Sequence, residues 1–353
     1  MTRFAPAAAP VIALLLAVPG CTPTDVDDDT PTPGEPLAAS ESDFTADAGD
    51  LVLEGTLLLP DRVDGEPVPG VVLVHGSGPH PRDAPLGGQL NMAFGFEIPV
   101  FEEIATHLQA AGYAVYRYDK RSCGDWGACD NDYPLPDDTL TAEAFVHDAA
   151  AAMDALGAHP DVDPARLAAV GHSQGGGFAP HVVDLAGGVG ISVAGNWSAI
   201  DALLAYQADW SRTLLQAAGA TPTDIDAALA DLDQAILDLA ELRAGTWGGG
   251  PIFGASALFW ESWMALDDER PVLAATHAND LAAINGDYDW NVPPSELAGW
   301  RSAGVETVEL PCVTHALNCV RQPDWTIITA ADIGDAVDED LLAALVELLA
   351  ARL

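Results

Sequence analysis

The sequence predicts an α/β protein with a mostly parallel central sheet flanked by helices. Short apolar runs rich in β-branched residues alternate with longer segments of helical periodicity. Several of these runs stop at glycines, which is typical of buried parallel strands. Strands that alternate with helices form βαβ units with right-handed crossovers, and such units build a parallel sheet.

Each element rests on a local pattern. The run "PGVVLVHGSG" is β-branched and ends in glycines, the helical segment 99–112 has Gly112 as its C-terminal stop, and a glycine-rich helix begins directly after the strand "RLAAVGHS". In chain order the predicted strands are 51–60, 69–78, 113–119, 166–173, 189–196, 280–286 and 305–311, and the predicted helices are 99–112, 141–159, 174–186 and 339–353.

The alternation of strands and helices stops between about residues 197 and 270. This region is acidic, rich in Ala and Leu, and helical in pattern, as in "DIDAALADLDQAILDLAELRAG". It carries no strand signal. We therefore predict a helical cap insertion that covers one end of the sheet.

The N-terminal segment predicts export. Residues 1–20 read as a signal peptide, because one arginine precedes an apolar run too short to span a bilayer comfortably. The sequence "LAVPGC" resembles the lipobox of bacterial lipoproteins, which implies lipidation of Cys21 and a cell-envelope location, periplasmic or on the outer surface. Ordinary secretion is the alternative. Residues 21–45 are rich in Pro, Thr and Asp and predict a flexible tether before a folded domain at 46–353.

The charge balance restricts the partners. The formal net charge is −41, with 13 basic residues against 54 acidic ones. A surface this acidic repels phosphate backbones, so we expect no nucleic-acid partner. Contact with a membrane is expected only through the N-terminal lipid, and the oligomeric state is not predicted.

Four cysteines are left if Cys21 carries lipid, and an even number in an oxidising compartment favours disulfides. Three connectivities are possible. The two local pairs, Cys123–Cys129 and Cys312–Cys319, need the fewest assumptions. The second pair flanks a histidine in "PCVTHALNC", a spacing that also allows a zinc site made of Cys312, His315, Cys319 and a fourth ligand.

The segment "GHSQG", residues 171–175, fits the nucleophile pattern G-x-S-x-G. A buried strand precedes it and a glycine-rich helix start follows it, which is the arrangement that a nucleophile elbow requires. The tight turn presents Ser173 above the end of the strand, near the positive end of the helix dipole. We predict that Ser173 is a nucleophile.

A serine hydroxyl is a weak nucleophile and needs a base, which in this arrangement follows the serine and an acid in chain order. The segment "LAAINGDYDWNVPP" supplies two candidate acids, Asp287 and Asp289. His315 is the only histidine after both aspartates, and is the predicted base. The backbone N–H groups of Gln174 and Ser77 are the predicted donors to an oxyanion.

Four segments together resemble the α/β-hydrolases, in the branch of bacterial esterases and dienelactone-hydrolase-like proteins: "VVLVHGSGP", "AGYAVYRYDKRSCG", "DVDPARLAAVGHSQGG" and "INGDYDWNVPP". The resemblance runs from about Leu51 to Leu353. It implies the α/β-hydrolase fold, and a pattern G-x-x-D-x-x-V-P that selects Asp289 over Asp287 as the acid. It also implies a structural Arg82–Asp83 pair. The loop "SCGDWGAC" departs from the Gly-x-Gly that is usual in these relatives.

The expected function is that of a serine hydrolase, most simply a carboxylesterase acting on small ester or thioester substrates, with no metal and no organic cofactor. An exopeptidase or amidase using the same triad is the alternative within enzymes. A non-catalytic surface-binding lipoprotein is the alternative from another class.

Overall fold

The computed structural model describes residues 34–87, 97–121, 123–124, 129, 139–322 and 324–353. The predicted signal peptide (1–20), the lipidation site Cys21 and the first part of the predicted tether lie outside the described residues. No helix among the residues that the structure describes is long and apolar enough to cross a membrane.

The predicted α/β fold with a mostly parallel sheet is confirmed. Eight strands form one sheet in the order β12-β11-β10-β9-β5-β8-β3-β2. From β12 to β8 all neighbours are parallel, whereas β3 pairs antiparallel with both β8 and β2. The strands are β2 Ser40–Asp47, β3 Val52–Leu59, β5 Val68–Val74, β8 Ala114–Tyr118, β9 Val162–His172, β10 Val189–Val193, β11 Leu281–Gly286 and β12 Glu306–Leu310. Two short pairs lie outside this sheet: β1 Pro36–Leu37 with β4 Arg62–Val63, and β6 Pro85–Leu86 with β7 Ile98–Pro99.

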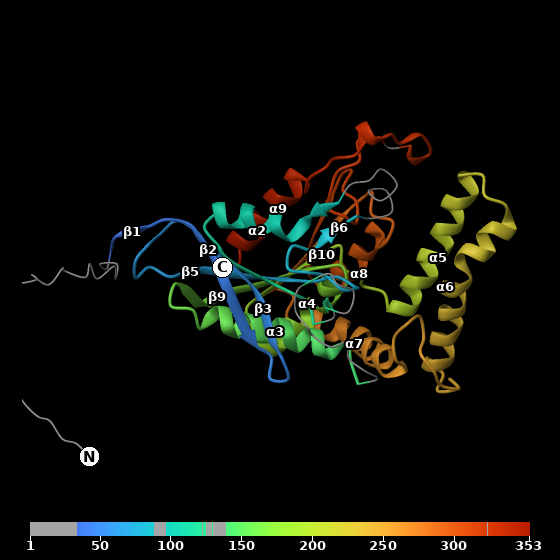
Figure 1. Ribbon diagram of the computed structural model, residues 1–353, viewed down its shortest axis with the longest axis horizontal. Helices are drawn as coiled ribbons and strands as arrows, with labels where there is room; N and C mark the ends of the chain where they lie inside the picture. The colour runs from blue at the N-terminus through green and yellow to red at the C-terminus, as the bar shows by residue number, and fades with distance from the viewer. Residues whose placement is uncertain (1–33, 88–96, 122, 125–128, 130–138, 323) are drawn as a thin grey trace, which may run out of the picture. The chain divides into compact units, whose positions relative to one another are not determined.

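Helices cover both faces of the sheet (Figure 1). On one face α2 Val100–Ala110 and α9 Glu339–Ala350 share a hydrophobic core, and on the other α3 Glu143–Gly157, α4 Gln174–Ala186 and α7 Ala257–Thr276 share another. Successive residues of β5 alternate between the two, with Val72 and Val74 in the core under α3 and Val71 and Leu73 in the core under α2. A strand buried on both faces must be apolar throughout, and for this reason β5 appears in the sequence as a continuous apolar run.

The predicted tether ends earlier in the structure than residue 45. Strand β2 pairs with β3 from Ser40↔Leu59 to Asp47↔Val52, so the folded domain includes residues assigned to the tether. Because β2 lies at the edge of the sheet, most of its side chains are exposed and polar, and only a few residues such as Phe44 and Ala46 face the core. A polar edge strand of this kind gives little hydrophobic signal in the sequence.

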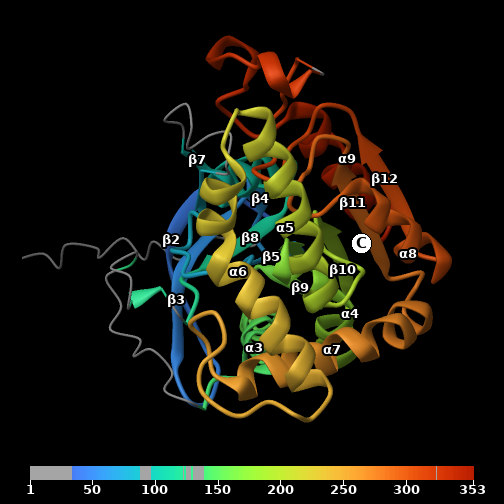
Figure 2. The same cartoon turned by 90° about the vertical axis from the view of Figure 1, so that its right-hand side faces the viewer.

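The predicted cap insertion, about 197–270, consists of two different parts. Helices α5 Ile200–Ala217 and α6 Pro222–Arg243 lie side by side as a hairpin (Figure 2). Helix α7 instead packs on α4, with Trp263 of α7 edge-on to Phe178 of α4. The insertion proper is therefore the α5–α6 hairpin, and α7 is a crossover helix that covers the sheet.

The small helical and 3-10 segments follow the last two strands. Helix α8 Leu297–Ser302 lies on the α4 side of the sheet, where it shares a third apolar cluster with β11. The 3-10 segments are η2 Pro294–Glu296, η3 Trp325–Ile327 and η4 Ala330–Asp332. The predicted local disulfides, Cys123–Cys129 and Cys312–Cys319, are both present.

A buried histidine of α4 makes folding stability depend on pH. Burial, together with the nearby Arg270, lowers the pKa of His181 to about 4 from the ordinary 6.5. Between these values the unfolded chain binds a proton at this position and the folded protein does not, so stability falls as the pH falls through this range. We expect His181→Leu to flatten the dependence of unfolding free energy on pH between 6.5 and 4 by up to about 1.4 kcal/mol per pH unit. Chemical denaturation at a series of pH values measures the unfolding free energy of the wild type and the variant. Parallel curves for the two proteins would show that the pKa of His181 is the same in the folded and unfolded states.

Candidate active site

The turn between β9 and α4 holds Ser173 in a strained conformation. Ser173 has φ 54° and ψ −117°, and its backbone N–H donates to the carbonyl of Val193 at 2.9 Å. A Cβ at Gly171 would lie 2.2 Å from the carbonyl oxygen of Gly175, and one at Gly175 would lie 2.4 Å from that of Val74. Only glycine fits at either position. The two glycines thus permit the sharp turn that presents the serine hydroxyl at the N-terminus of α4.

The structure brings together the three predicted triad residues. Nε2 of His315 lies 3.0 Å from Oγ of Ser173, and Nδ1 of His315 lies 2.8 Å from Oδ2 of Asp289. The other carboxylate oxygen of Asp289 accepts the backbone N–H groups of Asn291 and Val292, at 2.9 and 2.8 Å. Asp289 is 1% exposed. Its carboxylate is therefore held in one orientation, from which it accepts the Nδ1–H of the histidine and leaves Nε2 free to accept a proton.

The second candidate acid, Asp287, has a different role. Its carboxylate accepts the backbone N–H of Cys312 at 2.6 Å, and its own N–H donates to the carbonyl of Leu310 at 2.9 Å. Close packing also joins the two loops here, since a Cβ at Gly286 would lie 1.9 Å from the carbonyl oxygen of Val313. Asp287 ties the loop of the acid to the loop of the histidine.

The loop that carries His315 is fixed from several sides. The Cys312–Cys319 disulfide closes it, and the N–H of Thr314 donates to the carbonyl of Asn318 at 2.8 Å. The side chain of Asn318 in turn donates to the carbonyl of Gly334 at 2.6 Å. Because both thiols are consumed in the disulfide, they cannot serve as thiolate ligands, and the zinc alternative for "PCVTHALNC" is wrong.

His172, the residue before Ser173 in the elbow, connects the elbow to this loop. Its Nε2–H donates to the backbone carbonyl of His315 at 2.9 Å, and the two rings lie 4.9 Å apart. Burial and the neighbouring His315 hold the pKa of His172 well below its usual value. A neutral His172 therefore positions the backbone of the histidine loop next to Ser173. In the sequence, the indication of this role is the position of His172 directly before Ser173 in "GHSQG".

The predicted oxyanion donors lie beside the serine. Gln174 is the first residue of α4, and the loop after β5 passes so close to the elbow that a Cβ at Gly76 would lie 3.1 Å from Cβ of Ser173. Ser77 follows Gly76 directly. The sequence did not assign a role to Lys120, whose ammonium donates to the carbonyl of Gly76 and to the side chain of Gln174.

The expected pair between Arg82 and Asp83 is not what the structure shows. Arg82 forms a two-pronged ion pair with Asp119, with Nη2 to Oδ2 at 2.7 Å, and Asp83 pairs with Arg117 of β8. Both pairs fasten the loop after β5 to β8 and the loop that follows it. The residues are structural, as expected, but their partners lie in β8 and directly after it.

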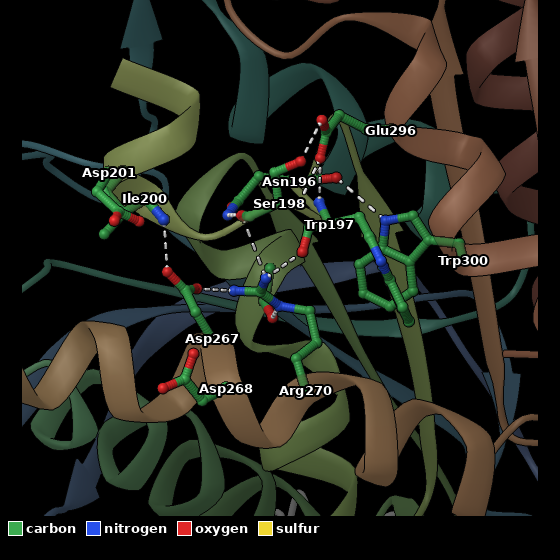
Figure 3. A network of polar contacts seen from close by, with 12 residues as sticks. Asn196, Trp197, Ser198, Ile200, Asp201, Asp267, Asp268, Arg270, Glu296 and Trp300 are labelled. Atoms are coloured by element: carbon green, nitrogen blue, oxygen red, sulfur yellow. Dashed lines mark hydrogen bonds and ion pairs between the residues drawn. The ribbon is translucent and has the colours of Figure 1, made fainter. Parts of the chain in front are cut away.

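A buried network fastens the segment between β10 and α5 to the core (Figure 3). The fully buried Arg270 donates to the carbonyls of Gly177 and Trp197, at 2.9 and 2.7 Å, and pairs with Asp267. The carboxylate of Glu296 accepts the N–H groups of Trp197 and Ser198, each at 2.6 Å. The chain therefore enters the α5–α6 hairpin from a rigid point.

Helix α5 contacts the loop of the acid. Gln207 donates to the carbonyl of Asn291 at 2.9 Å, and the ring of Trp210 lies 5.4 Å from that of Trp290. Trp325 completes what we call the tryptophan cluster (Trp210, Trp290 and Trp325), with centroids 6.0 and 6.3 Å from the other two rings. Trp290 directly follows Asp289, so this aromatic group ties α5 to the loop that carries the acid.

Comparison with known proteins agrees with the fold. The model of the alpha/beta hydrolase family matches residues 71–327, more than half of the chain. The esterase EstD of Thermotoga maritima is 30% identical over 151 residues, which are 42% of this chain and 31% of that relative, so the match spans only about a third of the relative's length.

Two solved structures share the fold. The alpha/beta hydrolase GrgF from Penicillium sp. sh18 superposes with a TM-score of 0.53 at 17% identity, covering 90% of this chain and 99% of that one. Est1E from Butyrivibrio proteoclasticus superposes with a TM-score of 0.50 at 12% identity, covering 88% of this chain and 98% of that one. At these identities the similarity concerns the fold.

The disulfide beside His315 gives a testable prediction. In Cys312→Ser/Cys319→Ser the histidine loop keeps its hydrogen bonds but gains freedom, so His315 spends less time within reach of Ser173. We expect the rate at which a fluorophosphonate labels Ser173 to fall about 10-fold, and the unfolding free energy to fall by only about 2 kcal/mol. Mass spectrometry follows the labelling, and urea denaturation measures the stability. An unchanged labelling rate in the folded variant would limit the disulfide to a role in stability.

Proposed function

The chain belongs to the α/β-hydrolase family, and on this premise we propose that it is a serine hydrolase that cleaves carboxylic esters or thioesters through an acyl-enzyme on Ser173. The observation that carries the proposal is the continuous chain of hydrogen bonds from Ser173 through His315 to the buried Asp289, at 3.0 and 2.8 Å. This arrangement can move a proton from a hydroxyl to an imidazole while a carboxylate stabilises the imidazolium.

In the proposed mechanism Oγ of Ser173 attacks the carbonyl carbon of the substrate, and Nε2 of His315 accepts the hydroxyl proton. The carbonyl oxygen becomes an oxyanion that accepts the N–H groups of Ser77 and Gln174. The tetrahedral intermediate then collapses, and His315 gives its proton to the leaving alkoxide or thiolate. Water then attacks the acyl-enzyme in the same way, with His315 first accepting and then returning a proton, and this step releases the acid and restores Ser173.

An ester or thioester is favoured over an amide because alkoxide and thiolate leave more readily than an amine does. The similarity to a protein named as an esterase supports the same choice. The proposed mechanism uses only side chains and backbone N–H groups of this chain, and it calls for no metal or organic cofactor.

We also propose that the protein acts outside the cytoplasm. Its two disulfides, Cys123–Cys129 and Cys312–Cys319, are typical of oxidising compartments. The signal peptide and the lipid on Cys21 stay predictions from the sequence.

A paired substrate assay tests the reaction. The wild-type protein should hydrolyse short 4-nitrophenyl esters, and it should act far more slowly on an aminoacyl 4-nitroanilide. Ser173→Ala should lower kcat/KM for the ester by about 10³-fold or more, because the remaining site can bind and polarise the substrate but not form the acyl-enzyme. If the anilide is the better substrate, the protein is a peptidase or amidase. If the wild type turns over neither and resists fluorophosphonates, it is not a serine hydrolase.

The tryptophan cluster suggests a preference among esters. We expect Trp210→Ala to lower kcat/KM for 4-nitrophenyl benzoate about 3- to 10-fold more than for 4-nitrophenyl acetate, because an aromatic pair contributes about 0.5–1.5 kcal/mol beyond area burial. Trp210→Phe is the matched control and should keep most of the difference. An equal loss on both substrates would mean that Trp210 only supports the position of α5.

A further inference from the structure

The only lysine of the chain is buried behind the proposed oxyanion site. Lys120 follows β8 by two residues and is 3% exposed. Its Nζ donates to the carbonyl of Gly76 at 2.5 Å and to Oε1 of Gln174 at 2.9 Å. The ring of Phe145 covers a third side, with Nζ 4.4 Å from its centroid. All three groups that hold the ammonium are uncharged.

One hydrogen bond reaches the carbonyl of the peptide that carries the Ser77 N–H, and the other reaches the side chain of Gln174, the second proposed oxyanion donor. The peptide between Gly76 and Ser77 is planar, and in a trans peptide the carbonyl and the N–H point in opposite directions. Fixing the carbonyl of Gly76 on Lys120 therefore fixes the direction of the Ser77 N–H. The bond to the Gln174 side chain anchors the residue that supplies the second N–H.

We propose that Lys120 is a positioning residue of the oxyanion site, which orients and polarises the peptide of Ser77 from behind and braces Gln174. The inference rests on the proposed function, since it assumes that Ser77 and Gln174 bind an oxyanion. A cation bound to a carbonyl draws electron density from the peptide, so the N–H on its other side becomes a stronger donor. The effect is large where water is excluded.

The titratable groups around Lys120 come from three segments: α3, the loop after β8 and the loop after β5. Asp148 of α3 is already held by Arg121, with Nε to Oδ2 at 2.7 Å, and His75 and His80 lie on the side of the loop after β5. Burial lowers the pKa of Lys120 to about 7, and Asp148 opposes this shift only in part. A cation this deeply buried is costly to a protein that uses it only for packing.

Because the chain has a single lysine, its titration can be observed directly in the wild-type protein. Protein labelled with [ε-¹³C]lysine should give one resonance, which titrates near pH 7 in the free enzyme. A boronic acid that forms an anionic tetrahedral adduct on Ser173 should raise this pKa by about one unit or more, because the new charge on the oxyanion favours the ammonium behind it. Ser173→Ala with the same boronic acid is the control and should show no shift. An unchanged pKa in the wild-type adduct overturns the proposal.

Variants supply a kinetic test. Lys120→Met keeps the length of the side chain and removes its donors, and it should lower kcat for a 4-nitrophenyl ester about 10- to 100-fold with little change in KM. The affinity for the boronic acid should fall by a similar factor. Lys120→Arg keeps a charge at every pH and should restore part of kcat, most visibly above pH 7. Arg166→Met removes a cation from a partly exposed ion pair with Asp163 and should behave as the wild type.

The possible failures are distinguishable. A wild type that neither hydrolyses esters nor labels at Ser173 overturns the proposed function, and with it this role of Lys120. An active wild type whose Lys120→Met variant keeps kcat and boronic-acid affinity overturns the role of Lys120 alone. If that variant does not fold, the lysine titration in the wild-type protein decides.

Discussion

The candidate site depends on one constraint, the parallel pairing of six neighbouring strands. Because β12, β11, β10, β9, β5 and β8 all run in the same direction, their carboxyl ends meet at one edge of the sheet. Ser173 follows β9, Asp289 follows β11 and His315 follows β12, while Gly76 and Lys120 follow β5 and β8. Ser173 and His315, 142 positions apart in the chain, are therefore brought within hydrogen-bonding distance by the sheet, and short loops only adjust their final positions.

The fold and the three triad residues could be predicted because their signals are local. A strand buried on both faces must be apolar, and an elbow with Ser173 needs glycines where a Cβ would collide with the backbone. Chain order then left His315 as the one histidine after the acid. The choice of Asp289 over Asp287 as the acid needed the resemblance to a family, because both residues follow the same strand. Only the structure shows that Asp287 binds a backbone N–H and that Asp289 binds the histidine.

The remaining features depend on contacts that no local pattern records. The polar edge strand β2 resembles a tether because hydrogen bonding to β3, and not apolar burial, defines it. Helix α7 resembles the cap because helical periodicity does not reveal what a helix packs against. Lys120 and His172 are single residues whose roles come from groups more than forty positions away, the carbonyls of Gly76 and His315.

The network of Arg270 and Glu296 also bears on how such a protein can change over generations. It fixes residues 196–200 to the core at the point where the chain leaves β10, so the hairpin begins from an anchored base. Mutations in α6, and in the part of α5 beyond Trp210, can accumulate with little disturbance to Ser173 or Asp289. Selection can therefore reshape the hairpin for new ligands while the inherited chemistry at the sheet edge is conserved.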